Sequence, residues 1–110
     1  MKLDDLTLGE VKQLTAMLNG KFVTDHPWAI GENYLIRTVT MIDTGRLVAV
    51  TEHELVIEDA AWVADTGRFS DAVQKAIFGE VEPFPPGQVI IGRGSVIDAV
   101  RIKQLPREQK

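Results

Sequence analysis

Four arginines stand at positions in the sequence where a guanidinium group could bind an anion. They are Arg37, Arg46, Arg68 and Arg93. A guanidinium presents a planar fork of donors that matches the oxygens of a phosphate or a carboxylate. Arg37 lies within an apolar run, so we expect it to form an ion pair with a carboxylate such as Glu58 or Asp59. For Arg68 and Arg93, which lie beside glycines, ligand binding and exposure in a solvated turn both stay open.

Aromatic side chains offer a second kind of contact to a nucleotide, because a base can stack on them. Trp28, Trp62 and Phe69 are the candidates, although packing in the core or at an interface is the commoner role of such residues. Gly94 is expected to permit a tight turn, and His53 is expected to be an exposed polar residue in a charged turn. The candidate ligand-binding set is Arg37, Arg46, His53, Trp62, Arg68, Phe69, Arg93 and Gly94.

The sequence holds no catalytic constellation. It contains no cysteine and only two histidines, and it has neither a phosphate-binding glycine loop nor a nucleophile elbow. These observations predict a non-enzymatic protein that uses no metal and no other cofactor.

The tripeptide Asp-Thr-Gly, at residues 43–45 and 65–67, is the one feature that suggests catalysis. Together with Ile-Ile-Gly-Arg at residues 90–93 it resembles the retroviral-type aspartic proteases, whose dimers share a proton between two aspartates. An arginine follows each triplet, and its guanidinium is expected to lower the pKa of the aspartate and prevent that sharing. A dimeric aspartic protease is therefore a distant alternative, and two polar turns are the simpler interpretation.

Size and charge indicate one ordinary domain. The 110 residues carry a net charge of −4, and 45% of them are hydrophobic, which fits a single domain over residues 1–110. An acidic N-terminal sequence and the lack of an apolar run of about 18 residues predict a cytoplasmic protein with no membrane partner. The net negative charge also disfavours general coating of DNA, because binding to its phosphates needs clustered cations. Residues 93–110 carry five basic and two acidic side chains, and this local positive charge is enough to attract a small anionic ligand.

The apolar pattern predicts a mainly β protein with two helices. The expected parts are an N-terminal helix (residues 1–20), barrel strands (34–64 and 88–103), a helical insertion (65–87) and a polar tail that frays (104–110). A capping box from Thr7 to Glu10 marks the start of the first helix. In the insertion, Ser70 is expected to cap a helix that ends at Gly79, and a proline-rich loop follows it.

Residues 34–42 are expected to form one strand with alternating faces. In this strand Leu35, Arg37, Val39 and Met41 would share a face. The arginine would then lie among apolar side chains, which is the reason to expect an ion pair there.

Two blocks of the sequence resemble the motifs of Sm-like proteins. The first, residues 45–59, is a glycine, an apolar strand, a short polar turn and an apolar strand that ends in Glu-Asp. The second, residues 89–100, is an apolar strand, an Arg-Gly turn and another apolar strand. The resemblance implies a small antiparallel barrel of bent strands, in which Gly45 permits a sharp bend, and assembly into a homo-oligomer.

The chain as a whole is also similar to a group of small uncharacterised proteins of bacteriophages and prophages. The similar blocks are residues 34–40, 59–69, 80–83 and 105–108. This resemblance implies a phage origin and supplies no activity. Because such genes often serve counter-defence, the same role is expected here from context alone.

Two classes of function follow. The first is a phage-encoded oligomer that sequesters a nucleotide-type ligand, either a cyclic-nucleotide defence signal or a short RNA, with its arginines and aromatic residues. The second is a protein-protein interaction module that binds a host protein or a virion component through the first helix and the insertion.

Overall fold

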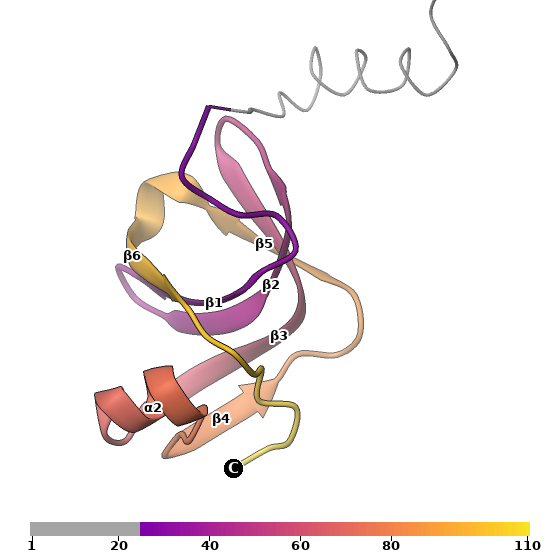
Figure 1. The fold of residues 1–110 in the computed structure, drawn as a ribbon. Helices are drawn as coiled ribbons and strands as arrows, with labels where there is room; N and C mark the ends of the chain where they lie inside the picture. Colours follow the sequence, from indigo (N-terminus) through magenta and orange to yellow (C-terminus); the bar gives the residue numbers. More distant parts are fainter. Residues whose placement is uncertain (1–24) are drawn as a thin grey trace, which may run out of the picture.

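One antiparallel sheet of six strands dominates the computed structural model, which describes residues 25–110 (Figure 1). In chain order the elements are β1 (Asn33–Thr38), β2 (Ile42–Val50), β3 (Glu54–Asp65), α2 (Phe69–Lys75), β4 (Glu80–Pro83), β5 (Gln88–Gly92), the 3-10 turn η2 (Arg93–Ser95) and β6 (Val96–Arg101). The predicted mainly β class is confirmed. The helix predicted within residues 1–20 lies outside the described residues.

The strand order is β4-β3-β2-β1-β6, with β5 also paired to β3. In Figure 1 the strands from β6 through β1, β2 and β3 to β5 curl around a common axis. The turn η2 joins β5 directly to β6, so the two ends of the curled sheet are linked by a very short connection. The narrower expectation of an Sm-like barrel stays a prediction.

Strand β3 bends at Asp59, because the strand carries one extra residue there. Thr44 and Arg46 of β2 lie two positions apart, whereas their partners Ala61 and Glu58 in β3 lie three positions apart. Asp59 takes up the extra residue with a φ of 52°, a left-handed conformation that aspartate tolerates better than most residues. Before the bend β3 pairs with β5, and after it β3 pairs with β4.

The two faces of the sheet bury two separate apolar clusters. Residues paired directly across antiparallel strands share a face. The concave face carries Tyr34, Ile36, Leu47, Val50, Leu55, Ile57, Ala60 and Ile91. The second cluster lies on the convex face against α2 and consists of Leu35, Ala61, Val63, Ala72, Phe78, Val81 and Ile102.

The expected single strand at residues 34–42 is wrong. Strand β1 ends at Thr38, where its backbone N–H donates to the Met41 carbonyl over 2.7 Å and closes a turn. Tyr34 and Ile36 therefore face the first core, whereas Val39 (71% exposed) and Met41 (49%) face solvent. The hydroxyl of Thr38 supports the turn by accepting from the Met41 N–H at 2.9 Å.

The insertion differs from the prediction in two ways. Helix α2 begins one residue before Ser70, no side chain caps it, and it ends at Lys75, before the C-cap residue Ala76 with a φ of 56°. Residues 80–83, predicted to lie in a loop, form strand β4 on the second half of β3. The sequence pattern showed little sign of this strand, because Val81 (2% exposed) is its one buried residue, packed in the second core.

The polar tail at residues 104–110 was expected to fray, and the structure instead places it against β4. The backbone groups of Lys110 and Val81 exchange two hydrogen bonds of 2.8 Å each. Leu105 adds an apolar contact to the second core. Main-chain bonds hold this segment, which is why its polar side chains gave no sign of it.

We predict that Gly45→Ala destabilises the fold by about 1–3 kcal/mol, because a new methyl group would overpack the first core. A Cβ at this position would lie 2.7 Å from Cδ1 and 2.9 Å from Cβ of Ile57. Urea denaturation measures the change. Gly92→Ala is the matched control, since a Cβ at Gly92 meets no atom within 4 Å. Equal stability of the two variants would contradict the close approach of β2 and β3.

Candidate functional site

An open groove of about 570 Å³ lies on the sheet beside the first core. We call it the Trp62 groove. Its floor is a row of three side chains from neighbouring strands, and its apolar walls come from the turn before β2, from β4 and the loop after it, and from β5. The wall residues are Met41, Pro83, Phe84, Pro85, Val89, Ile90 and Ile91.

The floor row consists of Asp43, Trp62 and Glu82. Asp43 pairs with Trp62 across β2 and β3, and Trp62 pairs with Glu82 across β3 and β4. Directly paired residues share a face, so the indole stands between two carboxylates. Asp43 also pairs with Ile36 of the first core, which shows that the groove continues the concave face of the sheet.

Asp43 is a buried residue whose carboxylate has no partner among residues 25–110. The residue is 8% exposed, and its side chain makes no hydrogen bond or ion pair there. Burial raises the pKa of Asp43 above its ordinary value, because removal from water disfavours the charged form. The groove therefore holds a carboxylate whose charge is not compensated within the described chain.

This environment corrects the expectation for the first Asp-Thr-Gly triplet. Residues 43–45 lie inside strand β2, so they do not form a turn. Arg46 was expected to lower the pKa of Asp43, yet its side chain points to the other face and binds Glu58 and Asp59. The second triplet does form a turn, in which the Gly67 N–H donates to the Asp65 carboxylate over 2.8 Å.

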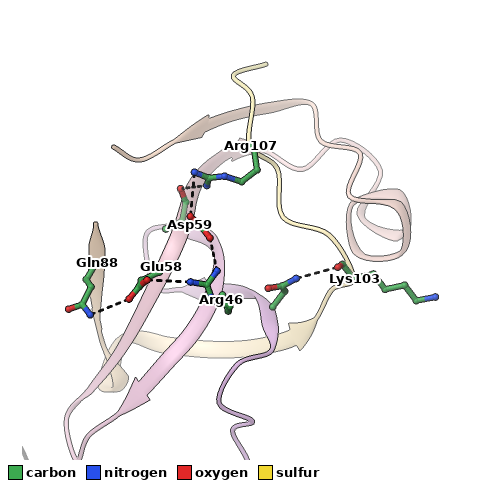
Figure 2. A network of polar contacts seen from close by, with 8 residues as sticks. Arg46, Glu58, Asp59, Gln88, Lys103 and Arg107 are labelled. Carbon is green, nitrogen blue, oxygen red and sulfur yellow. Dashed lines mark hydrogen bonds and ion pairs between the residues drawn. The ribbon is translucent and has the colours of Figure 1, made fainter. Parts of the chain in front are cut away.

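Arg46 belongs to a polar cluster on the convex face (Figure 2). Its guanidinium lies 2.5 Å from the carboxylate of Asp59 and 3.3 Å from that of Glu58. Arg107 of the tail reaches Asp59 at 3.8 Å, and Gln88 donates to Glu58 at 3.4 Å. The cluster thus ties β2, the bend of β3, β5 and the tail together. Arg46 has a structural partner set here, and sequence reasoning missed Arg107.

The hydrogen bond from Arg46 lowers the pKa of Asp59, and the positive charges of Arg46 and Arg107 act in the same direction. The same bond raises the pKa of Arg46. Asp59 is therefore ionised at neutral pH and keeps its ion pairs at the strained bend of β3.

Arg37 forms the predicted ion pair, but with a different carboxylate. Its guanidinium binds Asp98 of the neighbouring strand β6 through two hydrogen bonds, one of them 2.7 Å long. The expected partners, Glu58 and Asp59, lie with Arg46 instead. The side-chain hydrogen bond from Arg37 lowers the pKa of Asp98.

Phe69 and Arg68 lie at the start of α2, close to Arg37. The Arg37 guanidinium stands 5.5 Å from the centre of the Phe69 ring, a distance suited to a cation–π contact. Phe69 itself is 47% exposed. Arg68 is exposed, and within the described chain its side chain makes no hydrogen bond or ion pair.

His53, Arg93 and Gly94 come together at the β2–β3 turn. The Arg93 N–H donates to the His53 carbonyl at 2.8 Å, and the Arg93 guanidinium donates to the Thr51 carbonyl at 2.7 Å. His53 is exposed, as expected. Gly94 lies in η2 without a positive φ, so the tight turn expected to need a glycine does not need one.

The predicted site residues thus fall into four separate places. One is the Trp62 groove, the second holds Arg37, Arg68 and Phe69, the third is the Arg46 cluster, and the fourth is the β2–β3 turn. The groove contains only one member of the predicted set. Glu82 was missed because strand β4 was predicted to be loop, and Phe84 was missed because nothing in the predicted proline-rich loop showed that it lies beside Trp62.

Trp28 lies apart from these places and packs against the first core. Its ring meets Tyr34 edge-on at 5.2 Å, and the Tyr34 hydroxyl accepts from the Ala29 N–H at 2.9 Å. Trp28 is therefore a core residue, in agreement with the commoner role expected for it.

Neither a metal centre nor a membrane span is found in the part of the chain that the structure describes. No three metal-ligating side chains of residues 25–110 gather in one place. No helix in the same range is long and apolar enough to cross a bilayer.

Comparison of the chain with family models, with curated proteins and with solved structures finds no match to any of them.

We predict that Asp43→Asn stabilises the protein at pH 7, because it removes the cost of a buried charge. The raised pKa of Asp43 means that the folded state favours the protonated carboxyl group. The free-energy cost of ionising Asp43 in the folded protein therefore grows as pH rises from the unfolded pKa to the folded pKa. The variant should melt a few degrees higher at pH 7, and the difference should vanish below the unfolded pKa of about 3.9. Glu82→Gln is the control, since Glu82 is exposed. A lower melting temperature for Asp43→Asn at pH 7 would show that the carboxylate has a favourable partner.

We predict the opposite sign for Asp59→Asn, which keeps a side chain suited to positive φ and removes the charge. The lowered pKa of Asp59 means that its ion pairs stabilise the fold above the unfolded pKa, and that this contribution is lost as pH falls through the folded pKa. Thermal melts at pH 7 and at about pH 2 should show a loss only at the higher pH. Glu80→Gln, at an exposed carboxylate with no side-chain partner among residues 25–110, should change little at either pH.

Proposed function

We propose that this protein is a non-enzymatic binding module whose Trp62 groove takes an apolar segment of a partner protein. One observation carries the proposal: the groove is a wide, largely apolar hollow whose wall side chains stay in contact with water. Ile90 is 61% exposed and Met41 is 49% exposed, and both line it. Exposed apolar residues gathered around a hollow are typical of an interaction site.

The walls suit an extended peptide. Strand β4 continues into Pro83-Phe84-Pro85, and Val89 and Ile90 of β5 complete the same hollow. Prolines and a half-buried aromatic ring present a rigid apolar surface, so little conformational entropy is lost when a partner binds. The hollow has room for two or three side chains, by comparison with ordinary ligand pockets of roughly 300–1,000 Å³.

A nucleotide-type ligand is less well supported in this groove. Within the described part of the chain, the only charged residues in the lining are Asp43 and Glu82, and both would repel phosphate. Of the arginines expected to bind such a ligand, Arg37, Arg46 and Arg93 donate to acceptors of the protein itself. The acidic lining and the paired arginines together favour the interaction module over sequestration of a nucleotide.

Selection from a library of random twelve-residue peptides displayed on phage tests this proposal. We expect a family of related peptides that contain several apolar residues. Their affinity should fall at least tenfold in Ile90→Asp, because a charge on the wall would have to be desolvated on binding.

Ile97→Asp is the matched control, since Ile97 is 64% exposed and lies outside the groove. It should leave the affinity within about twofold of the parent. Absence of any enriched family would overturn the proposal. Peptides weakened by Ile97→Asp and not by Ile90→Asp would overturn it as well, because they would bind elsewhere.

A further inference from the structure

We infer that the Trp62 groove selects a partner segment with a basic side chain, arginine before lysine, whose cation lies on the indole of Trp62 between Asp43 and Glu82. The inference rests on the proposed function and names the chemistry of the partner. The argument starts from the floor of the groove, where the two carboxylates flank the aromatic ring.

Asp43 supplies the first reason. Asp43 is 8% exposed, and a carboxylate on so buried a residue, with no side-chain partner among residues 25–110, is unfavourable in the free protein. A ligand that brings a hydrogen-bond donor with a positive charge removes that disadvantage. A ligand that covers Asp43 with an apolar group increases it. The groove therefore distinguishes strongly between the two kinds of ligand.

Charge in the lining supplies the second reason. Glu82 approaches from β4 on the far side of Trp62, and no basic side chain of residues 25–110 lines the groove. Both charges of the lining are negative, so the field in the hollow favours a cation. The apolar walls displace water and strengthen this attraction.

Trp62 supplies the third reason. The face of an indole ring attracts a cation, and it does so more strongly than the rings of tyrosine or phenylalanine. Neighbouring strands lie about 4.8 Å apart, so each carboxylate is one strand away from the ring. A cation over the indole can therefore also reach a carboxylate oxygen.

The shape of the site favours arginine. A guanidinium is planar, so it can stack on the indole while its edge donates two parallel hydrogen bonds to the carboxylate of Asp43. A lysine ammonium can satisfy the charge, but it lacks the flat face and the paired donors. The aliphatic stem of either residue lies along the apolar wall near Phe84 and Val89.

The same arrangement makes binding depend on pH. Burial raises the pKa of Asp43 in the free protein, and among the described residues Glu82 is the only other titratable group in the lining. A bound guanidinium favours the ionised form of Asp43. Binding of an arginine peptide should therefore weaken as pH falls through the range in which Asp43 takes up its proton.

Selected peptides are the probes for the experiment. Each peptide that carries an arginine is synthesised again with citrulline, which keeps the shape of the side chain and removes its charge. On the wild-type protein we expect the citrulline peptide to bind at least tenfold more weakly. On Asp43→Asn the two peptides should differ by less than about threefold, because the partner charge is absent.

Asp71→Asn, at an acidic residue of α2 outside the groove, is the control and should keep the full difference. Groove-dependent peptides without a basic residue would overturn this inference and leave the proposed function standing. Arginine peptides that bind as well with citrulline would do the same. Loss of peptide binding altogether would overturn both. The expected stability of Asp43→Asn ensures that weak binding by this variant is not a failure to fold.

Discussion

Strand β3 pairs with β2, β4 and β5, and the left-handed conformation of Asp59 allows this one strand to make all three pairings. The extra residue turns the second half of the strand away from β5 and offers it to β4. Arg46 and Arg107 hold the carboxylate of the same residue, so the strained position is also an electrostatic anchor (Figure 2). Without the bend, Trp62 and Glu82 would not share a row with Asp43, and the groove would not form.

Acidic side chains on the two faces of the sheet differ in whether they have a basic partner. On the convex face, Glu58 and Asp59 meet arginines that connect the strands to the tail. On the concave face, Asp43 is buried without such a partner within residues 25–110. Alternation along a strand explains how this happens, because neighbouring residues such as Thr44 and Asp43 point to opposite faces. Arginines thus neutralise Glu58 and Asp59, which connect the strands and the tail. Asp43, which faces the groove, has no such neutralising partner among residues 25–110.

Much of the fold could be predicted from local patterns, and most of the candidate site could not. Runs of β-branched residues revealed the strands. Gly45 was expected to permit a sharp bend, and the structure places it where β2 approaches Ile57 of β3 so closely that a Cβ would not fit. Arg37 was expected to be paired because a charge in an apolar run needs a partner. Its true partner, Asp98, depends on the register of β1 with β6, which no local pattern encodes.

Strand β4 was missed for a different reason. It is four residues long, it ends in proline, and it is fixed by one buried valine, by pairing with β3 and by the bonds to Lys110. The floor of the groove unites residues from β2, β3 and β4 that lie up to 39 positions apart (43 to 82) in the chain. Each of them is unremarkable alone, so the site exists only once the register is known.

The pairing of Lys110 with Val81 bears on how the protein behaves at high concentration. A short outer strand with free N–H and C=O groups is a template on which another chain can pair, and such pairing begins many aggregates. Here Lys110 occupies the Val81 groups of that edge. Loss of this pairing would expose the edge together with the β4 wall of the groove, so the pairing protects both from unspecific association.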